Sequence, residues 1–422
     1  MIRKLYGRLR PVDHDALKIW LASRVSIWVI AGSVGYMFAT AGEGIVPLLD
    51  RWQQWDFDHY WGIALAGGYE GSPTGVPNEA FFPAFPASLW LGAELGVRHV
   101  VTGLVVSLVA GAVAAVALGR LGDLEGGRMV GRYAVLVWVL APSAVFLAAP
   151  YTEALFLAFA FPAWLAARRG HWLAAGVLTA LSCTVRVSGV FLVAALVVQW
   201  LATRRVSAGD TDDLETSRVG TSSPLSRDRY EEGDHETTLA GAAAQMSHDR
   251  HANGRWSWSG FGWLFLPAIP LLAWSVYLKS ETGDWLAWMT AQAEGWDRHF
   301  TLPWDSFANT WSAAFGGTQS PEFAWMFRAE IVAMIVGAAL TIALMVWKRW
   351  GEATWIGLQV VAFGTSTWYF SVPRATLLWW PLWIGIAALA VRRRWVLWAY
   401  LSVSVPLMVV WATAFLTGRW AG

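Results

Sequence analysis

The side chains best suited to chemistry lie in a short polar segment that follows the first long apolar run of the chain. Asp56 and Asp58 are followed by His59 and Tyr60, and Trp residues flank the group on both sides. Carboxylates and imidazoles commonly transfer protons in enzymes, and aromatic rings suit the faces of sugars. Near a membrane surface, this segment could position and deprotonate a sugar hydroxyl. From the residues alone, an interfacial amphipathic helix anchored by its Trp residues is the alternative.

Three arginines, far apart in the sequence, are the candidate anion-binding groups. Arg186 stands inside an otherwise apolar stretch, and a charge at the centre of a bilayer costs about 2.5–3.5 kcal/mol on insertion scales. Its default interpretation is therefore functional, with a phosphate as the expected ligand, and a structural pair with Glu153 is the alternative. Arg298 and Arg374 lie next to other apolar runs, where anion binding and interfacial anchoring are both open.

The composition is that of a protein that crosses a membrane several times. Of the 422 residues, 56% are hydrophobic and 14% are charged, and the mean hydropathy is +0.42; soluble proteins carry about 25% charged residues. A net charge of +1 provides no basic surface for nucleic acid. The single cysteine, Cys183, excludes an intrachain disulfide, and the histidines are dispersed. We therefore expect no metal and no other cofactor.

Eleven apolar runs are candidate membrane helices. They cover residues 17–39, 99–119, 133–150, 152–167, 171–185, 188–203, 259–279, 328–347, 353–370, 375–391 and 395–416. The run 82–97, which opens with Pro83 and Pro86, is predicted to be re-entrant or to lie at the membrane interface. The distribution of Lys and Arg places the N-terminus in the cytoplasm, and eleven spans then place the C-terminus outside. The polar candidate residues share the extracytoplasmic face on this map.

The polar segments divide the chain into three predicted parts. Residues 1–203 are an N-terminal transmembrane catalytic module, with an extracytoplasmic loop at 40–98. Residues 204–255 are rich in charged and small polar residues and are predicted to be a disordered cytoplasmic loop; a regulatory or docking role is the alternative. Residues 256–422 are a C-terminal transmembrane module with an extracytoplasmic segment at 280–325.

Several motifs stand in an order that is typical of one family. They are Trp55-Asp56-x-x-His59-Tyr60, Ile63-Ala64-x-x-Gly67-Gly68-Tyr69, Ala80-Phe81-Phe82-Pro83-x-Phe85-Pro86, Pro150-Tyr151-Thr152-Glu153-x-x-Phe156, Arg186-x-x-Gly189, Gly283-Asp284, Ala291-Gln292, Trp296-x-Arg298 and Ser371-x-Pro373-Arg374. In this order the chain resembles the PIG-V family of integral-membrane mannosyltransferases, which add the second mannose in GPI-anchor assembly, together with their bacterial relatives. Trp285 and Ala375 depart from the family pattern, which often has Pro and Tyr there. The preference for Arg over Lys suits a bacterial member.

The resemblance implies a fold and a reaction. The fold is an all-α polytopic membrane protein of the GT-C glycosyltransferase type, with about 11 transmembrane helices and a long first extracytoplasmic loop. The donor is polyprenyl-phosphate-mannose, and the acceptor is a lipid-linked molecule or a cell-envelope glycan. Catalysis is expected on the extracytoplasmic side of the plasma membrane, in contact with membrane lipids and without nucleic acid.

On this interpretation the chain is an inverting mannosyltransferase whose site residues have distinct roles. Asp56 is the expected general base, with Asp58 in reserve. Arg186, together with Arg298 or Arg374, is expected to stabilise the phosphate leaving group, because a guanidinium binds phosphate through two parallel donors. The residues expected to orient sugar or acceptor hydroxyls are His59, Tyr60, Glu153 and Gln292.

Two other classes of protein share part of this pattern. A secondary transporter or lipid flippase would also have many spans and an intramembrane arginine, but transporters usually place charges near the bilayer midplane in paired halves. No such pairing is visible in the sequence. A catalytically inactive subunit of GT-C type is the second alternative, and the presence of Asp56 argues against it.

Overall fold

The computed structural model describes residues 9–38, 46–66, 68–69, 75–217 and 259–421. In this part of the chain the regular secondary structure is helical, apart from one isolated bridge between Phe300 and Ser366. The elements are α2 (Pro11–Met37), η1 (Asp50–Trp52), α3 (Asp56–Ala66), η2 (Asn78–Ala80), α4 (Ala84–Glu94), α5 (His99–Val139), η3 (Ala144–Leu147), α6 (Thr152–Arg168), α7 (Trp172–Cys183), α8 (Ser188–Ser217), α10 (Ser259–Gly262), η4 (Trp263–Phe265), α11 (Ala268–Thr282), α12 (Ala287–Trp296), α13 (Pro303–Phe315), α14 (Pro321–Val346), α15 (Trp350–Gly364), α16 (Val372–Ala375), η5 (Thr376–Leu378), α17 (Trp380–Arg392) and α18 (Arg394–Leu416).

Long apolar helices confirm an all-α protein that crosses a membrane several times. By length and composition, five segments of the described chain can span a bilayer: Pro11–Met37, His99–Val139, Gly260–Thr282, Pro321–Val346 and Arg394–Leu416. A sixth is the bent pair Val372–Leu378 and Trp380–Arg392, whose axes meet at 73°.

The expected count of eleven spans is not confirmed. Trp172–Cys183 and Ser188–Thr203 are shorter apolar helices, and at 1.5 Å per residue a 12-residue helix covers only about 18 Å of a hydrocarbon core of about 30 Å.

Helix α5 covers two of the predicted runs and reverses the chain between them. Its backbone is not helical at Gly126 and Gly127, and Gly127 has a φ of +81° that favours glycine. The two arms then pack closely, since a Cβ added to Gly131 would lie 2.3 Å from the carbonyl oxygen of Gly119. Small residues let helix backbones approach one another in this way.

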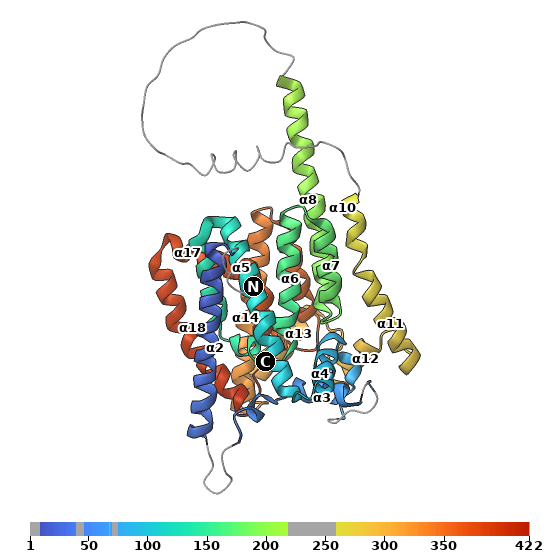
Figure 1. The fold of residues 1–422 in the computed structure, drawn as a ribbon, viewed down its shortest axis with the longest axis vertical. Helices are drawn as coiled ribbons and strands as arrows, with labels where there is room; N and C mark the ends of the chain where they lie inside the picture. Colours follow the sequence, from blue (N-terminus) through green and yellow to red (C-terminus); the bar gives the residue numbers. More distant parts are fainter. Residues whose placement is uncertain (1–8, 39–45, 67, 70–74, 218–258, 422) are drawn as a thin grey trace.

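The segments predicted to carry chemistry gather at one end of the helix bundle. In Figure 1, α3, α4 and α12 lie together at the lower end, whereas α8 projects beyond the upper end. The run predicted to be re-entrant or interfacial contains the short helix α4, whose exposed Trp90 and Leu91 lie on its surface. Helix α8 continues to Ser217, past the predicted start of the loop at residue 204; the rest of that loop, from 218, lies outside the described residues.

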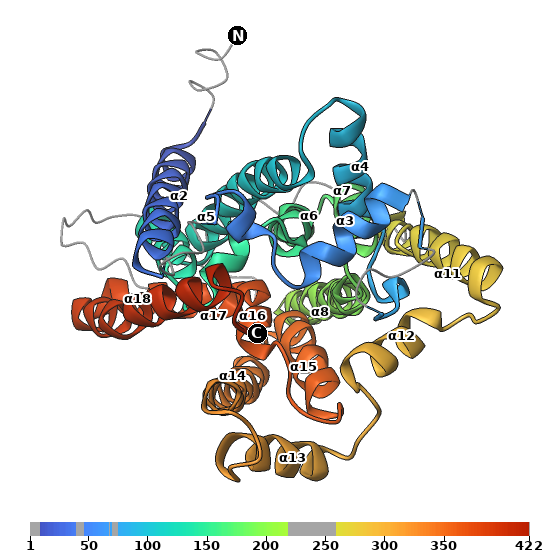
Figure 2. The same cartoon turned by 90° about the horizontal axis from the view of Figure 1, so that it is seen from below.

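Helices from the two halves of the chain pack against one another. Helix α5 packs against α2, α6 and α17, while α8 packs against α15 and α2 against α18. Seen from below in Figure 2, α6 and α8 lie near the centre, with α2 and α18 on one side and α11 and α12 on the other. The candidate site can therefore be built from segments far apart in the sequence.

Candidate active site

A buried arginine fixes the loop that leads into α3 and its first residue, Asp56. The Arg51 guanidinium donates hydrogen bonds to the carbonyl oxygens of Ala31 (2.7 Å) and Val46 (2.6 Å). Gly35 makes room for it, because any Cβ there would overlap the guanidinium. The chain thereby anchors the segment before α3 on the first long helix.

Trp55 sets the direction in which α3 begins. Its φ of +51° is uncommon for a residue with a side chain, and such conformations concentrate at functional sites. Its indole Nε1 donates to the carbonyl oxygen of Arg419 at 3.3 Å, which ties the start of α3 to the far end of the chain. Asp56 follows as the first residue of the helix.

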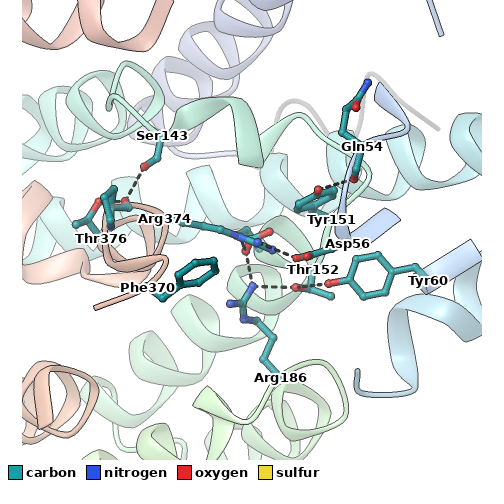
Figure 3. Close-up of polar contacts among 12 residues, drawn as sticks. Gln54, Asp56, Tyr60, Ser143, Tyr151, Thr152, Arg186, Phe370, Arg374 and Thr376 are labelled. Atoms are coloured by element: carbon teal, nitrogen blue, oxygen red, sulfur yellow. Dashed lines mark hydrogen bonds and ion pairs between the residues drawn. The ribbon is translucent and has the colours of Figure 1, made fainter. Parts of the chain in front are cut away.

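Two arginines and two carboxylates, one of which is Asp56, form a single ion-pair cluster. Arg374 donates to Asp56 Oδ2 at 2.8 Å and also bonds Glu153. Arg186 bonds the same Glu153 carboxylate and donates to Thr152 Oγ1 at 2.8 Å. Figure 3 shows Arg374 and Arg186 approaching from different parts of the fold, with Asp56 beyond them. The Arg186–Glu153 pair that the sequence left as an alternative is therefore present, but as part of a larger cluster.

Aromatic rings and a backbone hydrogen bond also fix the position of Arg374. Its guanidinium lies 4.8 Å from the ring centroids of both Phe146 and Tyr151, as expected for cation–π packing. Ser143 donates to the carbonyl oxygen of Pro373 at 2.8 Å, which fixes the backbone next to Arg374. Tyr151 in turn donates to the carbonyl oxygen of Gln54 at 2.6 Å (Figure 3). The cluster is thus a preorganised group of charges.

Arg298 is a third cation close to the cluster, and it has donors to spare. Its Nη2 donates to the carbonyl oxygen of Phe370 at 3.3 Å, while its buried Nε has no hydrogen-bond partner among the described residues. Burial lowers the pKa of Arg298 to about 10, and the nearby carboxylates of Glu330 and Asp56 oppose that shift. The Arg298 guanidinium therefore stays charged at neutral pH and can bind an anion.

A cavity of about 600 Å³ adjoins these charges. Aromatic side chains on α8, α12 and α15, among them Phe191, Trp288 and Phe363, also line it. The predicted site residues that line it are Asp56, Tyr60, Arg186, Gln292, Arg298 and Arg374. The lining therefore combines charged and apolar side chains, which suits a ligand that has both a polar and an apolar part.

Three predicted site residues do not line the cavity in the described part of the chain. His59 is buried, places Nδ1 3.0 Å from Asn78 Oδ1 and stacks on Phe81. Asp58 is partly buried, and burial raises its pKa. Glu153 is fully covered and lies behind the two guanidinium groups that it bridges. Among the described residues, these three therefore stand next to the cavity lining and do not form part of it.

Sequence reasoning missed residues that the site uses. Thr152 accepts a hydrogen bond from Arg186 and lies 3.5 Å from the Tyr60 hydroxyl. Glu330, a carboxylate inside the apolar run 328–347, bonds the backbone just before Arg374. The rule that singles out charges within apolar runs would have found Glu330. Thr152 stands in one of the motifs quoted above, but nothing in the sequence assigns it a role. The described residues contain no group of three or more His, Cys, Asp or Glu that could hold a metal ion.

Comparison with known proteins identifies relatives over the first half of the chain. Residues 45–206 match the family described as Mannosyltransferase (PIG-V). GPI alpha-1,6-mannosyltransferase 2 of Cricetulus griseus is 38% identical over 159 residues, which are 35% of this chain and 30% of the relative. The protein of the same name from Rattus norvegicus is 38% identical over 211 residues, 43% of this chain and 42% of the relative, and that of Homo sapiens is 36% identical over 154 residues, 34% and 30%.

These matches cover less than half of each curated relative. They confirm the resemblance to the PIG-V family in a region that contains Asp56, Glu153 and Arg186 but ends before Arg298 and Arg374. Among solved structures, the crystal structure of ArnT from Cupriavidus metallidurans bound to undecaprenyl phosphate aligns with 94% of this chain and 75% of that chain, at a TM-score of 0.38 and 14% identity.

Proposed function

Starting from a PIG-V-like mannosyltransferase sequence at residues 45–206, we propose that this multi-pass membrane protein transfers mannose from polyprenyl-phosphate-mannose to a lipid-linked or cell-envelope acceptor. The transfer is inverting, takes place on the extracytoplasmic side of the plasma membrane and uses no metal. The helical bundle serves as a GT-C glycosyltransferase fold. The single observation that carries the proposal is the cluster of Arg374, Glu153, Arg186 and Asp56 beside a cavity lined by charged and apolar side chains.

The proposed general base is Asp56. Its Oδ2 accepts the hydrogen bond from Arg374, and no hydrogen bond from the described residues reaches its other carboxylate oxygen. That oxygen is available to the acceptor hydroxyl. As the hydroxyl oxygen attacks the anomeric carbon, its proton passes to Asp56, and the bond from that carbon to the phosphate oxygen breaks. The phosphate leaves with the bonding electrons, so one displacement inverts the anomeric centre.

The arginines stabilise the charge that develops on the leaving phosphate. Arg186 and Arg298 both line the cavity, and the Nε of Arg298 has no partner within the described part of the chain. Donors that are fixed before the reaction are most effective where charge develops, because they need no reorganisation. Arg374 bridges Asp56 and Glu153, so it also orients the base.

The structure suggests a change of role for two predicted ligands of the sugar. Tyr60 and Gln292 line the cavity and remain the proposed partners of sugar or acceptor hydroxyls. Glu153 instead acts by fixing the positions of the Arg186 and Arg374 guanidinium groups relative to each other. His59 acts by bracing α3 against Asn78 and Phe81.

The decisive experiment measures transfer of labelled mannose from purified polyprenyl-phosphate-mannose to membrane lipid extracts by the purified protein. We expect a labelled product with the wild type and almost none with Asp56→Asn. Asp58→Asn is the matched control, because it removes a carboxylate from the same helix but away from the cavity. Movement of labelled lipid across a reconstituted bilayer without any product would favour a flippase and overturn the proposal.

A further inference from the structure

A buried carboxylate on α14 contacts the turn that carries Arg374. Glu330 is fully covered, and both of its oxygens are used: Oε1 accepts the backbone N–H of Ser371 at 2.8 Å and Oε2 that of Val372 at 2.7 Å. A carboxylate within an apolar membrane helix is costly and is usually retained for a function. Glu330 does not line the cavity described above, so it has no direct access to a ligand there.

The turn that Glu330 contacts is unusual in its backbone. Ser371 has a φ of +66°, in the left-handed region that a residue with a side chain seldom adopts. In this conformation successive N–H groups converge, and such a concave arrangement binds an anion. Here the anion is the Glu330 carboxylate. Helix α16 begins at the next residue and carries Arg374 two positions further on.

The same turn is contacted from the cavity side by a cation. Arg298 donates to the carbonyl oxygen of Phe370, the residue before Ser371, and the charges of Arg298 and Glu330 influence each other. The turn is thus held between a carboxylate that accepts from its N–H groups and a guanidinium that donates to its carbonyl oxygen.

We infer that Glu330 is a positioning residue, which fixes the turn at residues 370–372 and through it sets Arg374 against Asp56 and Glu153. The inference rests on the proposed function, because it gives Glu330 a part in catalysis through Arg374. Its structural half, that Glu330 holds the turn, can be measured without any enzymatic activity.

The test combines hydrogen exchange with steady-state kinetics on the full-length protein in detergent. In Glu330→Gln, the side-chain oxygen can accept only one of the two N–H groups, and its amide group faces the other. Loss of a hydrogen bond to a charged group should speed exchange in a peptide that covers residues 370–376 by about tenfold to hundredfold, with little change in α2. Turnover should fall by about tenfold or more, and the KM for the donor should change less, because Arg186 and Arg298 still contact the phosphate.

Two further variants separate positioning from general stability. Glu330→Asp keeps the buried charge but is one methylene shorter, so it should reach one N–H group and give intermediate exchange and turnover. Thr341→Val is the control on the same helix, because the Thr341 hydroxyl donates within α14, to the carbonyl oxygen of Gly337. It should leave the exchange at residues 370–376 and the turnover unchanged.

The outcomes of these measurements are distinct. Unchanged exchange at residues 370–376 in Glu330→Gln, or equal acceleration across the whole protein, would overturn the inference. Faster exchange confined to the turn with normal turnover would also overturn it, because the turn would then not set the position of Arg374. If the wild type makes no product, the proposed function fails, and the exchange measurement still decides whether Glu330 holds the turn.

Discussion

Replacement of Glu153 by Gln distinguishes a carboxylate that holds the arginines from one that binds the sugar directly. Glu153 is fully covered and bridges Arg186 and Arg374. Removing one partner of a buried ion pair usually costs about 3–5 kcal/mol. Two features reduce that cost here: Arg374 keeps its contact with Asp56 and its two aromatic neighbours, and the Arg186 side chain is 24% exposed and can be hydrated.

We therefore expect the free energy of unfolding to fall by about 2 kcal/mol in Glu153→Gln, below the usual range for a broken buried pair. The assay is thermal unfolding of the detergent-solubilised protein together with steady-state mannose transfer. Turnover should fall by about tenfold or more, because the two guanidinium groups lose their common anchor. The KM for the donor should not rise, since the lost carboxylate competed with phosphate for the same donors.

The opposite pattern would refute this reasoning. If stability is unchanged and the donor or acceptor binds more weakly, Glu153 contacts the substrate directly, as the sequence alone predicted. Gln359→Glu is not a suitable comparison because Gln359 lines the cavity. A better control is Thr179→Val. Its buried hydroxyl donates to the carbonyl oxygen of Ala175 on the same helix at 2.7 Å, so the variant should leave transfer unchanged.

Four further predictions concern single substitutions. Asp56→Asn should lower single-turnover transfer by about 10²–10⁴-fold, because an amide cannot accept the proton, and normal turnover would remove the base assignment. Asp58→Asn should leave transfer near the wild-type rate. Burial raises the pKa of Asp58, so the ionised carboxylate destabilises the folded protein at a pH above that pKa. The neutral Asn variant should therefore not be less stable than the wild type at neutral pH. Arg186→Lys should weaken donor binding in an equilibrium assay and lower turnover, because it loses the paired donors that grip phosphate; unchanged binding would place the phosphate elsewhere. Gly131→Ala should lower the free energy of unfolding by about 1–3 kcal/mol through overpacking, since the new Cβ would lie 2.3 Å from the Gly119 carbonyl oxygen, and an unchanged unfolding temperature would contradict this.

Much of the site could be predicted because each chemical group is out of place in an apolar chain. Arg186 stands out as a charge within an apolar stretch, and Asp56 as a carboxylate among aromatic residues. The contact between Asp56 and Arg374 could not be derived from a local sequence pattern. These residues are 318 positions apart and come together only when the helix bundle packs. The motif order supplied that information through the family resemblance, and the structure supplies the contacts.

The rest escaped prediction for physical reasons that differ from residue to residue. Asp56 and Asp58 have the same side chain and lie two positions apart on one helix, but that spacing turns them toward different surroundings. The partners of Glu330 are backbone N–H groups, which every residue except proline carries, so no residue type marks them. The predicted count of eleven spans was not confirmed, because hydropathy detects an apolar run, whereas crossing a bilayer also requires sufficient length in one straight helix.

The contact between Arg374 and Asp56 links the two charge changes that the proposed reaction requires. When the acceptor hydroxyl gives its proton to Asp56, that carboxylate loses its negative charge; in the same step the departing phosphate gains one. A guanidinium bonded only to the base would lose its partner as the reaction proceeds, and one bonded only to the phosphate would do nothing to keep the base in place. Arg374 contacts Asp56 on one side and, through Glu153, adjoins Arg186 on the other. Negative charge can therefore shift from the base to the phosphate while it stays beside the same fixed group of cations. Donors that are fixed before the reaction lower the cost of such a shift, because they need no reorganisation.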